Sequence, residues 1–383
     1  MVARTFGRPA ARRSDYGEDF VHTSRRRLLI AGAVIIAIAG ALPLCPGCAQ
    51  SQGTASSSSP AGSAVRSTSA GFSAASPAAN ATDDATTTPS PSPTVGPLHT
   101  TVLTGRQSKV NLIMHLPTSP QTVIFGSSRT LKFESAYMKK LTGRRTFNTA
   151  VSSGRPIDEW CFQQLIRKRF PHANYKALIM LDVEQMLGDP TKIKRVPDDL
   201  LYVPALTQFL PPELLKVPPL YAAPRADDEK YTTWGFAYLG HYDIKQQQGM
   251  TEAKWMPGTL RYFGHKYPGG AYGPALSSVI YLRKLISELN SWGTTPVVAL
   301  TPYNTQLLAF IKARGWQKWH DMTVNFVKEL RDKEHLKLVF MDFSYPSSVG
   351  GNDAEFYDGY HPRTSLTEKM IRAVLKRSGR VLL

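Results

Sequence analysis

Short apolar runs that alternate with amphipathic stretches constrain the fold of this chain more than any other feature. Runs short enough for buried strands occupy residues 122–125, 177–183, 296–301 and 338–343, and a further strand is expected just before residue 148. Between them, residues 156–170, 276–289 and 306–331 have the apolar spacing of helices, the last with a break near Gly315. This alternation predicts an α/β fold, in which helices cover both faces of a mostly parallel sheet. Because function in such sheets lies at the carboxyl ends of the strands, the segments that follow the runs are the candidate site.

An uncharged apolar run at residues 28–44 follows an N-terminal segment with seven Arg residues. A basic flank before such a run indicates either a secretory signal or a single membrane anchor. Seventeen residues is short for a spanning helix and long for a signal core, so the length leaves both options open. The Arg residues on the N-terminal side predict that everything after residue 44 lies outside the cytoplasm. Residues 24–29, Ser-Arg-Arg-Arg-Leu-Leu, also resemble a twin-arginine export signal.

Two of the chain's three cysteines directly follow the apolar run. The segment around Cys48 resembles a bacterial lipobox, with Gly47 before the cysteine, which predicts a lipid attached to Cys48. Cys45 stands where lipoboxes have an aliphatic residue, and the alternatives are that both cysteines are incidental or pair with each other. The expected order is therefore a cytoplasmic basic segment at 1–27 and a signal or membrane anchor at 28–48.

Residues 49–97 form a linker of low complexity, in which 40 of the 49 residues are Ala, Ser, Thr, Gly or Pro. Such a segment buries too little apolar surface to offset the entropy of ordering, so we expect it to be disordered. As a flexible coil it would span roughly 35–40 Å, since the end-to-end distance grows as about 5–6 Å times the square root of the length. The linker would hold a folded domain, residues 98–383, away from a membrane and within reach of a cell wall.

Positive charge is concentrated in the predicted folded domain. The whole chain has 46 Lys and Arg against 29 Asp and Glu, a formal charge of +17, and residues 98–383 retain +14 of it. On its own such an excess fits nucleic acid, an anionic membrane surface or an acidic polymer. For an exported domain, the expected partners are envelope polysaccharides or other anionic polymers, together with the membrane that its anchor enters, and not nucleic acid.

Polar segments follow three of the predicted strands: Ser127, Ser128 and Arg129 after the first, residues 148–154 after the second, and Asp358 and His361 after the last. A serine nucleophile needs a base to accept its proton and an acid to orient that base. Asp358 and His361, three residues apart on a turn, supply such a pair. Ser128, at a strand-to-helix turn, lies near backbone N–H groups that can hold an oxyanion. Taken alone, Ser128 would more often cap the following helix, and Arg129 would more often form a surface ion pair than bind a substrate carboxylate or phosphate.

In this order the three segments resemble the SGNH (GDSL-like) hydrolase superfamily. Gly126-Ser127-Ser128 stands where that family has Gly-Asp-Ser, residues 148–154 resemble its second block, and residues 358–362 (Asp-Gly-Tyr-His-Pro) match its final block. The Gly-Ser-Ser-Arg variant is more similar to a branch with alginate O-acetylation proteins and DltD-type proteins of teichoic acid D-alanylation than to soluble lipases. The resemblance implies a three-layer α/β/α flavodoxin-like fold, and a serine esterase or O-acyltransferase that acts on acyl groups of envelope polymers without a cofactor or metal.

The resemblance also assigns roles to individual residues. Ser128 would be the nucleophile, His361 the general base and then acid, and Asp358 the residue that orients the imidazole. Backbone N–H groups of Ser128 and of Ser153 or Gly154 would hold the oxyanion. Hydrolysis and acyl transfer both pass through the same acyl-enzyme, so the sequence does not separate them.

The sequence departs from the family pattern at two positions. Glu184 stands where the third block has an Asn whose side chain donates to the oxyanion, and Asn304, after a later strand, is the candidate substitute. An ionised Glu repels an oxyanion, and losing one donor costs about 100- to 1000-fold in rate. The Gly of the second block is also displaced by one position, from 153 to 154. These departures motivate an alternative, a catalytically silent polymer-binding or assembly protein on the same fold.

Residues 187–272 interrupt the alternation with 13 aromatic residues and 10 prolines. We expect an insertion at the strand ends, placed like a lid over the substrate. Its aromatic side chains, Trp234 and Tyr262 among them, could stack on sugar rings or instead form a small core of the insertion's own. Its basic residues Arg225, Arg261 and Lys266 are candidates for holding acidic groups. The sequence contains neither a zinc-ligand pattern nor a Gly-rich phosphate loop.

Overall fold

The computed structural model describes residues 104–191, 193, 196–216, 226, 228–267 and 273–382. Three predicted segments lie outside the described residues: the cytoplasmic segment at 1–27, the signal or anchor at 28–48 with its candidate lipid site at Cys48, and the linker at 49–97. Arg225 lies outside them as well. Within the described ranges, no helix is both long enough and apolar enough to cross a membrane. The account of the fold therefore concerns the part of the chain that starts at Thr104.

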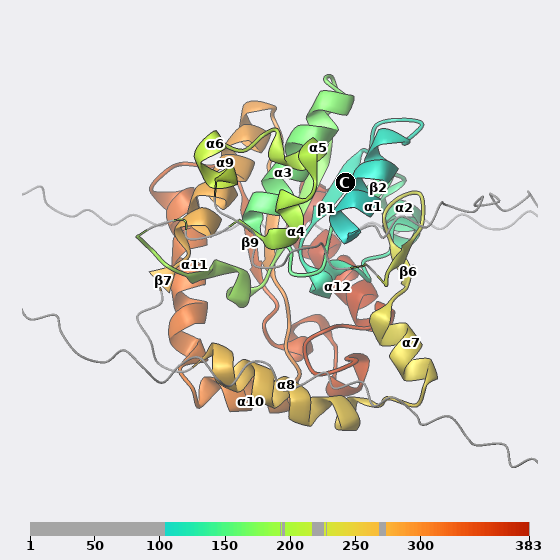
Figure 1. Ribbon diagram of the computed structural model, residues 1–383, viewed down its shortest axis with the longest axis vertical. Helices are drawn as coiled ribbons and strands as arrows, with labels where there is room; N and C mark the ends of the chain where they lie inside the picture. The colour runs from blue at the N-terminus through green and yellow to red at the C-terminus, as the bar shows by residue number, and fades with distance from the viewer. Residues whose placement is uncertain are drawn as a thin grey trace, which may run out of the picture. The chain divides into compact units, whose positions relative to one another are not determined.

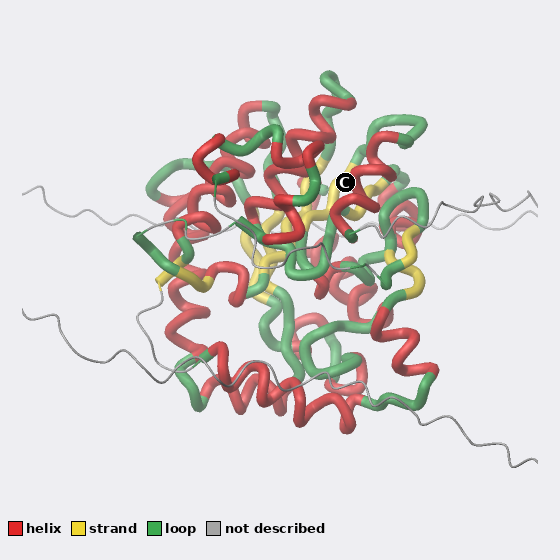
Figure 2. Tube along the Cα trace, viewed as in Figure 1, coloured by secondary structure: helices red, strands yellow, loops and turns green. Residues whose placement is uncertain are grey.

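Five parallel strands form the central sheet, in the order β2-β1-β3-β8-β9 (Figures 1 and 2). They are β1 (Thr122–Phe125), β2 (Thr146–Asn148), β3 (Lys176–Leu181), β8 (Val297–Leu300) and β9 (Val339–Asp342). β1 is flanked on both sides, with Ile124 paired to Asn148 of β2 and to Leu178 of β3. The predicted strands and the parallel α/β sheet are confirmed, and the strand order is that of flavodoxin-like folds.

Helices cover both faces of the sheet and complete three layers. One face carries α1 (Gly105–Met114), α3 (Pro156–Arg169), α9 (Leu276–Ser291) and α11 (Trp316–Asp332), and the other carries α2 (Ser135–Thr142) and α12 (Thr364–Ser378). Val123 and Phe125 of β1 pack into the first core, and Ile124 between them packs into the second. Because both faces are covered, the strands are continuous apolar runs rather than alternating ones.

The predicted break in the helical stretch at 306–331 is confirmed at Gly315. α10 (Thr305–Lys312) ends just before it, and α11 begins just after it. Gly315 has φ of +88°, a left-handed conformation that favours glycine and ends a helix. The break lets α10 turn away from the sheet, so that it packs beside α8 (Glu252–Lys266) instead.

The segment between β3 and α9 contains short elements and two longer helices. After the 3-10 turn η2 (Val183–Met186), these are β4 (Leu187–Gly188), α4 (Asp198–Leu201), α5 (Pro204–Thr207), α6 (Pro212–Leu215), β5 (Lys230–Tyr231), β6 (Ala237–Leu239), α7 (His241–Gln247), α8 and β7 (Gly273–Pro274). In Figure 1, α8 runs along the lower edge and α7 lies at the lower right. Tyr242 of α7 packs on His361 and Tyr262 of α8 on Tyr360, both in the loop before α12. Met256 and Phe263 of α8 pack against Val183 and Tyr303, which follow β3 and β8. This inserted segment therefore covers the carboxyl ends of the central strands.

Candidate active site

A tight turn after β1 places Ser128 at the carboxyl end of the sheet. Ser128 is the first residue of a 3-10 turn, η1 (Ser128–Thr130), and the hydroxyl of Ser127 caps that turn by accepting the backbone N–H of Arg129 at 3.2 Å. Gly126 before it has φ of +159°, and a Cβ atom there would lie 2.3 Å from Oγ1 of Thr130. The turn thus requires glycine two residues before Ser128, as the sequence has it.

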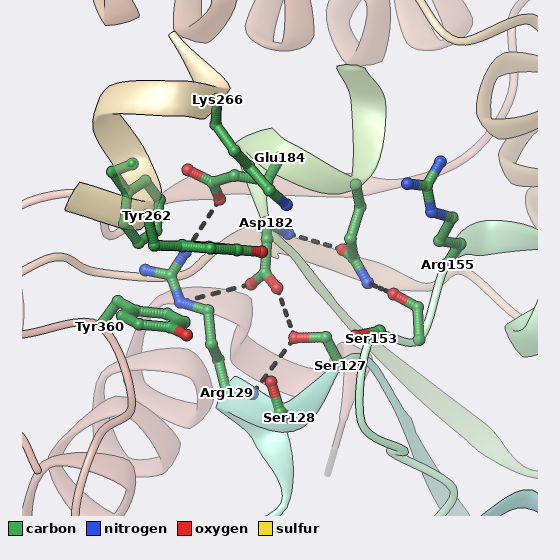
Figure 3. Close-up of a pocket in the computed structure, with 13 residues that line it drawn as sticks. Ser127, Ser128, Arg129, Ser153, Arg155, Asp182, Glu184, Tyr262, Lys266 and Tyr360 are labelled. Carbon is green, nitrogen blue, oxygen red and sulfur yellow. Dashed lines mark hydrogen bonds and ion pairs between the residues drawn. The ribbon is translucent and has the colours of Figure 1, made fainter. Parts of the chain in front are cut away.

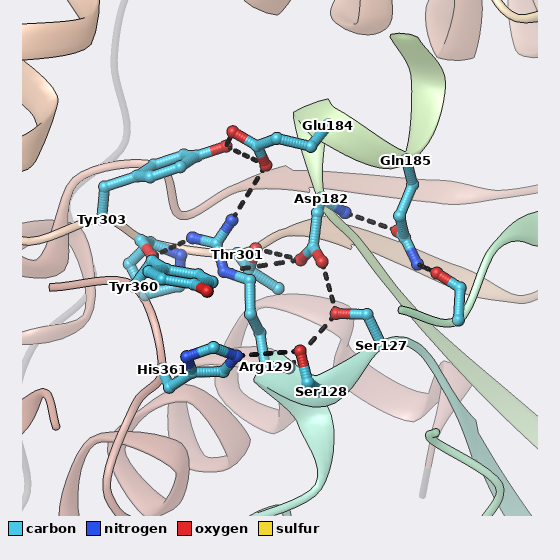
Figure 4. Close-up of polar contacts among 12 residues, drawn as sticks. Ser127, Ser128, Arg129, Asp182, Glu184, Gln185, Thr301, Tyr303, Tyr360 and His361 are labelled. Carbon is cyan, nitrogen blue, oxygen red and sulfur yellow. Dashed lines mark hydrogen bonds and ion pairs between the residues drawn. The ribbon is translucent and has the colours of Figure 1, made fainter. Parts of the chain in front are cut away.

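Ser128, His361 and Asp358 form a chain of hydrogen bonds, and Figure 4 shows the link between Ser128 and His361. Nε2 of His361 lies 2.9 Å from Oγ of Ser128, and Nδ1 lies 2.8 Å from Oδ2 of Asp358. Oδ1 of Asp358 accepts the backbone N–H groups of Tyr360 at 3.2 Å and of His361 at 2.9 Å. Burial opposes ionisation of Asp358, but the imidazole and these backbone donors outweigh it and lower the pKa of the carboxyl. The three predicted catalytic residues are brought together with a hydroxyl, a base and an orienting carboxylate in sequence.

The loop after β2 supplies the backbone next to Ser128. Ser153 has φ of +54°, a left-handed conformation that is unusual for serine and is typical of strained functional turns. Gly154 donates its N–H to the carbonyl of Val151 at 3.0 Å, and a Cβ on Gly154 would lie 2.8 Å from the carbonyl oxygen of Gly126. Among the described residues, no acceptor takes the N–H of Ser153 or of Ser128. Of the two positions predicted for the oxyanion donor, Ser153 has the free N–H and Gly154 provides the close approach to β1.

Ser128 and Ser153 line one cavity of about 150 Å³ (Figure 3). Gln185 of η2 fixes one wall, because its amide oxygen accepts the N–H of Asp182 at 2.7 Å and its amide nitrogen donates to the carbonyl of Gly154 at 2.5 Å. The end of β3 and the loop after β2 are thereby tied together by one buried side chain. The position of the Ser153 N–H depends on this link.

Arg129 is the centre of a buried charge network beneath the cavity (Figure 4). Its guanidinium lies 3.3 Å from Glu184 and 3.6 Å from Asp182, and it lies over the ring of Tyr303 at 4.0 Å. It also donates to the carbonyl of Pro302. Burial opposes the charge, but the two carboxylates outweigh it and raise the pKa of Arg129. Of the two roles predicted for Arg129 the structure shows an ion pair, and it is an interior one that leaves the guanidinium little capacity for substrate.

Glu184 is the negative partner in this network. Besides the ion pair with Arg129, it accepts hydrogen bonds from the hydroxyls of Tyr303 at 2.8 Å and of Tyr267 at 2.5 Å. The carboxylate in the family's Asn position is therefore held by a cation and two phenols. Glu184 shares the Arg129 guanidinium with Asp182, so its carboxylate is held in the network, and its effect on an oxyanion stays a prediction.

Asn304, the candidate substitute for that Asn, is not brought to Ser128. Its side-chain oxygen caps α10 by accepting the N–H groups of Gln306 at 2.7 Å and of Leu307 at 3.2 Å, and its amide nitrogen donates to Glu252. Asn304 does not line the cavity. The structure assigns this side chain to capping a helix instead of donating to an oxyanion.

The two aromatic residues predicted to bind substrate lie in different places. Tyr262 of α8 lines the cavity and is 47% exposed, with its ring stacked on that of Tyr360 at 6.3 Å. Trp234 lies in the turn between β5 and β6, and its carbonyl accepts the N–H of Asn148 at 3.0 Å. The Trp234 side chain lines a separate hollow beside α2 and packs against the first core. Only Tyr262 is placed to contact a substrate at Ser128.

Three residues of the site were not identified from the sequence: Tyr242, Arg155 and Gln185. Tyr242 of α7 packs against His361, with ring centroids 4.2 Å apart. Arg155, the residue before α3, lines the cavity opposite α8. No spacing rule marks these positions, because each reaches the site through the path of a loop or of the inserted segment.

Comparison with known proteins adds little to this geometry. No protein-family model matches the chain, and no curated protein matches it. Among solved structures, the chain is similar to a candidate acylhydrolase of Bacteroides fragilis, at 13% sequence identity and a TM-score of 0.35, over 72% of this chain and 97% of the other. A likeness at that level assigns no function, so membership of the SGNH superfamily, and of its DltD-like branch, stays a prediction.

Proposed function

We propose that this chain is a serine esterase or O-acyltransferase of the SGNH type, which acts on ester-linked acyl groups of a cell-envelope polysaccharide or similar polymer. The observation that carries the proposal is the unbroken hydrogen-bond chain from Ser128 through His361 to Asp358 at the carboxyl end of a parallel sheet. Nucleophile, base and orienting acid in this geometry define acyl-transfer chemistry on many unrelated folds. The cavity beside Ser128 provides the place for the ester.

In the first half of the reaction, Oγ of Ser128 attacks the acyl carbonyl carbon while Nε2 of His361 accepts the hydroxyl proton. Asp358 holds the imidazole through Nδ1 and stays ionised, which stabilises the imidazolium. The carbonyl oxygen becomes an oxyanion, for which the unpaired N–H groups of Ser128 and Ser153 are the donors. The tetrahedral intermediate collapses when the ester C–O bond breaks, and the leaving alcohol takes the proton from His361.

In the second half, an attacking hydroxyl resolves the acyl-Ser128 ester. His361 accepts the proton of that hydroxyl, the new C–O bond forms, and Oγ of Ser128 leaves with the proton that the imidazole returns. If the hydroxyl belongs to water the result is hydrolysis, and if it belongs to a sugar or polyol the result is acyl transfer. Both outcomes use the same residues of this chain.

The expected location supports a polymer substrate. The sequence predicts export, an anchor at 28–48 and a flexible linker at 49–97, so the domain would face the cell envelope. Its net charge of +14 suits anionic polymers. The substrate class in this proposal follows from that combination, together with the resemblance to envelope acyl-transfer proteins.

Labelling with a fluorophosphonate probe tests the proposal on the full chain. Labelling of the wild type that is absent in Ser128→Ala and in His361→Ala would establish an activated serine. Ser291→Ala, at an exposed serine at the end of α9, is the matched control and should keep the label. A wild type that neither labels nor cleaves an aryl acetate would overturn the enzyme proposal, and would favour the catalytically silent polymer-binding protein that the Glu184 departure motivated.

A further inference from the structure

Two positively charged side chains line the cavity beside Ser128 without a carboxylate partner among the described residues. Arg155 enters from the N-terminal end of α3 and Lys266 from the last turn of α8 (Figure 3). Within the described ranges, neither side chain makes a hydrogen bond or ion pair with another residue, and the Lys266 ammonium contacts only the ring of Tyr262, at 4.8 Å. A partly buried guanidinium without a partner costs free energy, so the position of Arg155 needs an explanation.

The other charged side chains of the cavity already have protein partners among the described residues. Arg129 is held between Asp182 and Glu184. Asp182 also accepts hydroxyl hydrogen bonds from Ser127 and Thr301, and Glu184 accepts those of two tyrosines. The two carboxylates are therefore committed to the network beneath the cavity. Arg155 and Lys266 are the other charged side chains that line the cavity, and they can contact a bound ligand.

Arg155 is the more costly of the two to leave unpaired. Burial, which the field of Asp158 only partly offsets, lowers the pKa of its guanidinium. An anion placed next to it would recover that free energy through charge-assisted hydrogen bonds, and a planar guanidinium suits the two oxygens of a carboxylate or phosphate. Lys266 is exposed at the rim, and a flexible ammonium there can follow the same anion from the α8 side.

We propose that Arg155 and Lys266 form a subsite for a carboxylate or phosphate group carried by the alcohol part of the acyl ester. This inference rests on the proposed function and narrows it: the substrates are acyl esters whose alcohol part carries a carboxylate or phosphate group. The cavity, at about 150 Å³, is smaller than typical ligand sites of roughly 300–1,000 Å³, so it accommodates one charged unit next to the ester. The anion would fix the substrate beside Ser128 and thereby orient the ester carbonyl.

Three acetyl esters on the full-length chain test the subsite: the O-acetyl derivatives of methyl glucoside, methyl glucuronoside and glucose 6-phosphate. The measured quantity is the ratio of kcat/KM for each anionic ester to that for the neutral one, from acetate release. We expect a ratio of about 100 in the wild type, since two charge-assisted contacts are each worth about tenfold. The relative ratios for glucuronoside and phosphate identify which anion the subsite takes.

Arg155→Gln and Lys266→Gln should each lower the ratio about tenfold, and the double variant should abolish the preference. Arg261→Gln is the matched control, because Arg261 is an exposed cation on α8 that does not line the cavity. A preference that survives in the double variant, or a wild type without any preference that still cleaves the neutral ester, overturns the subsite while the hydrolase proposal stands.

Binding to the Ser128→Ala chain separates the two proposals. By calorimetry, we expect methyl glucuronoside or glucose 6-phosphate to bind at least tenfold more tightly than methyl glucoside, and the difference to vanish when Arg155→Gln and Lys266→Gln are added. If fluorophosphonate labelling fails and this difference is present, the subsite stands on a binding protein. If the three sugars bind equally, the subsite is wrong whatever the labelling shows.

Discussion

The hydroxyl of Tyr242 lies 3.3 Å from Nε2 of His361, although the two residues are far apart in the chain and only His361 belongs to a recognisable motif. The ring of Tyr242 packs on the imidazole with centroids 4.2 Å apart, and Tyr360 packs on the same imidazole at 3.9 Å. Tyr242 comes from α7 of the inserted segment, which therefore forms part of the wall around the base. Two aromatic faces at this distance favour a cation and exclude water, so they should stabilise the imidazolium that forms during catalysis.

Replacement of Tyr242 by Ala should lower kcat roughly 3- to 30-fold, which is the range expected from losing one cation–π contact. Tyr242→Phe keeps the ring and should keep most of the activity. Tyr238→Ala is the matched control, because Tyr238 is in the same inserted segment and is 53% exposed. Steady-state kinetics on an aryl acetate measure the effect, and an unchanged kcat in Tyr242→Ala would show that the ring plays no part in the reaction.

Gln185 links the end of β3 to the loop that carries Ser153, so it acts on the oxyanion site through the backbone. Gln185→Leu removes the donor to Gly154 and should lower kcat at least tenfold with little change in KM, because a fully lost oxyanion donor costs about 100- to 1000-fold. Gln163→Leu makes the same change at a buried glutamine of α3 whose amide has no hydrogen-bond partner among the described residues. Equal losses in both variants, or a rise in KM alone, would contradict this positioning role.

The sheet and the cluster of Ser128, His361 and Asp358 were predictable because both leave local marks in the sequence. A strand buried on both faces must be apolar throughout, and a turn that presents Ser128 needs Gly126 before it. His361 needs an acid close in sequence when the pair shares one turn, and Asp358 lies three residues away. In each case a short stretch of chain determines the geometry, so short-range reasoning succeeded.

The rest of the site depends on contacts between distant segments. Helix α1 has no apolar stripe in its sequence, since its buried face includes the charged residue Lys109. Lys109 donates to the carbonyl of Asn148, which is distant in the chain, at 2.7 Å. From the sequence alone, Glu184 was expected to repel an oxyanion. Its partner Arg129 lies far from it in the chain and is brought to it by the pairing of β1 with β3. Trp234 and Tyr262 both lie in the aromatic-rich inserted segment. Only the path of that segment places Trp234 against the first core and Tyr262 at the cavity.

Placing at position 184 the Asn that SGNH proteins have in their third block should not raise the proposed activity. Glu184→Asn leaves Arg129 with one carboxylate partner instead of two and leaves the phenols of Tyr267 and Tyr303 without their acceptor. We expect a loss of about 1–3 kcal/mol in the free energy of unfolding and no gain in kcat. Glu184→Gln, which keeps the chain length and one acceptor oxygen, should lose less. Chemical denaturation and kinetics check both, and a faster Glu184→Asn enzyme would mean that the carboxylate does oppose the oxyanion.

Asp358 should affect both the rate and the acid stability of the domain. Asp358→Asn should lower kcat about 10⁴-fold, as in other triads, because the amide favours the wrong imidazole tautomer. The pKa of Asp358 is lower in the folded state than in the unfolded chain, so its ionised form contributes stability above the unfolded value of about 3.9, and that stability is lost as the pH falls through the folded value. The difference in unfolding free energy between wild type and variant should therefore shrink below about pH 4. A difference that stays constant from pH 7 to pH 3 would contradict this assignment.

Glu159 of α3 should have the opposite effect on stability. It is fully buried with no hydrogen-bond partner for either oxygen among the described residues, and burial, reinforced by the charges of Asp158 and Asp182, raises its pKa well above the usual value. The unfolded chain then holds fewer protons than the folded one above about pH 4.3, so the free energy of unfolding falls as the pH rises from there.

Glu159→Gln removes this pH dependence and should raise the Tm at pH 7, because the folded state no longer has to keep a proton on a carboxyl that the unfolded chain releases. The gain should disappear near pH 4, where the wild-type carboxyl is neutral in both states. Glu213→Gln, at an exposed glutamate of α6, is the control and should leave the pH profile of the Tm unchanged. Calorimetry between pH 4 and pH 8 measures both variants, and a Glu159→Gln chain whose Tm follows the wild type at every pH would show that the buried carboxyl does not titrate as its surroundings require.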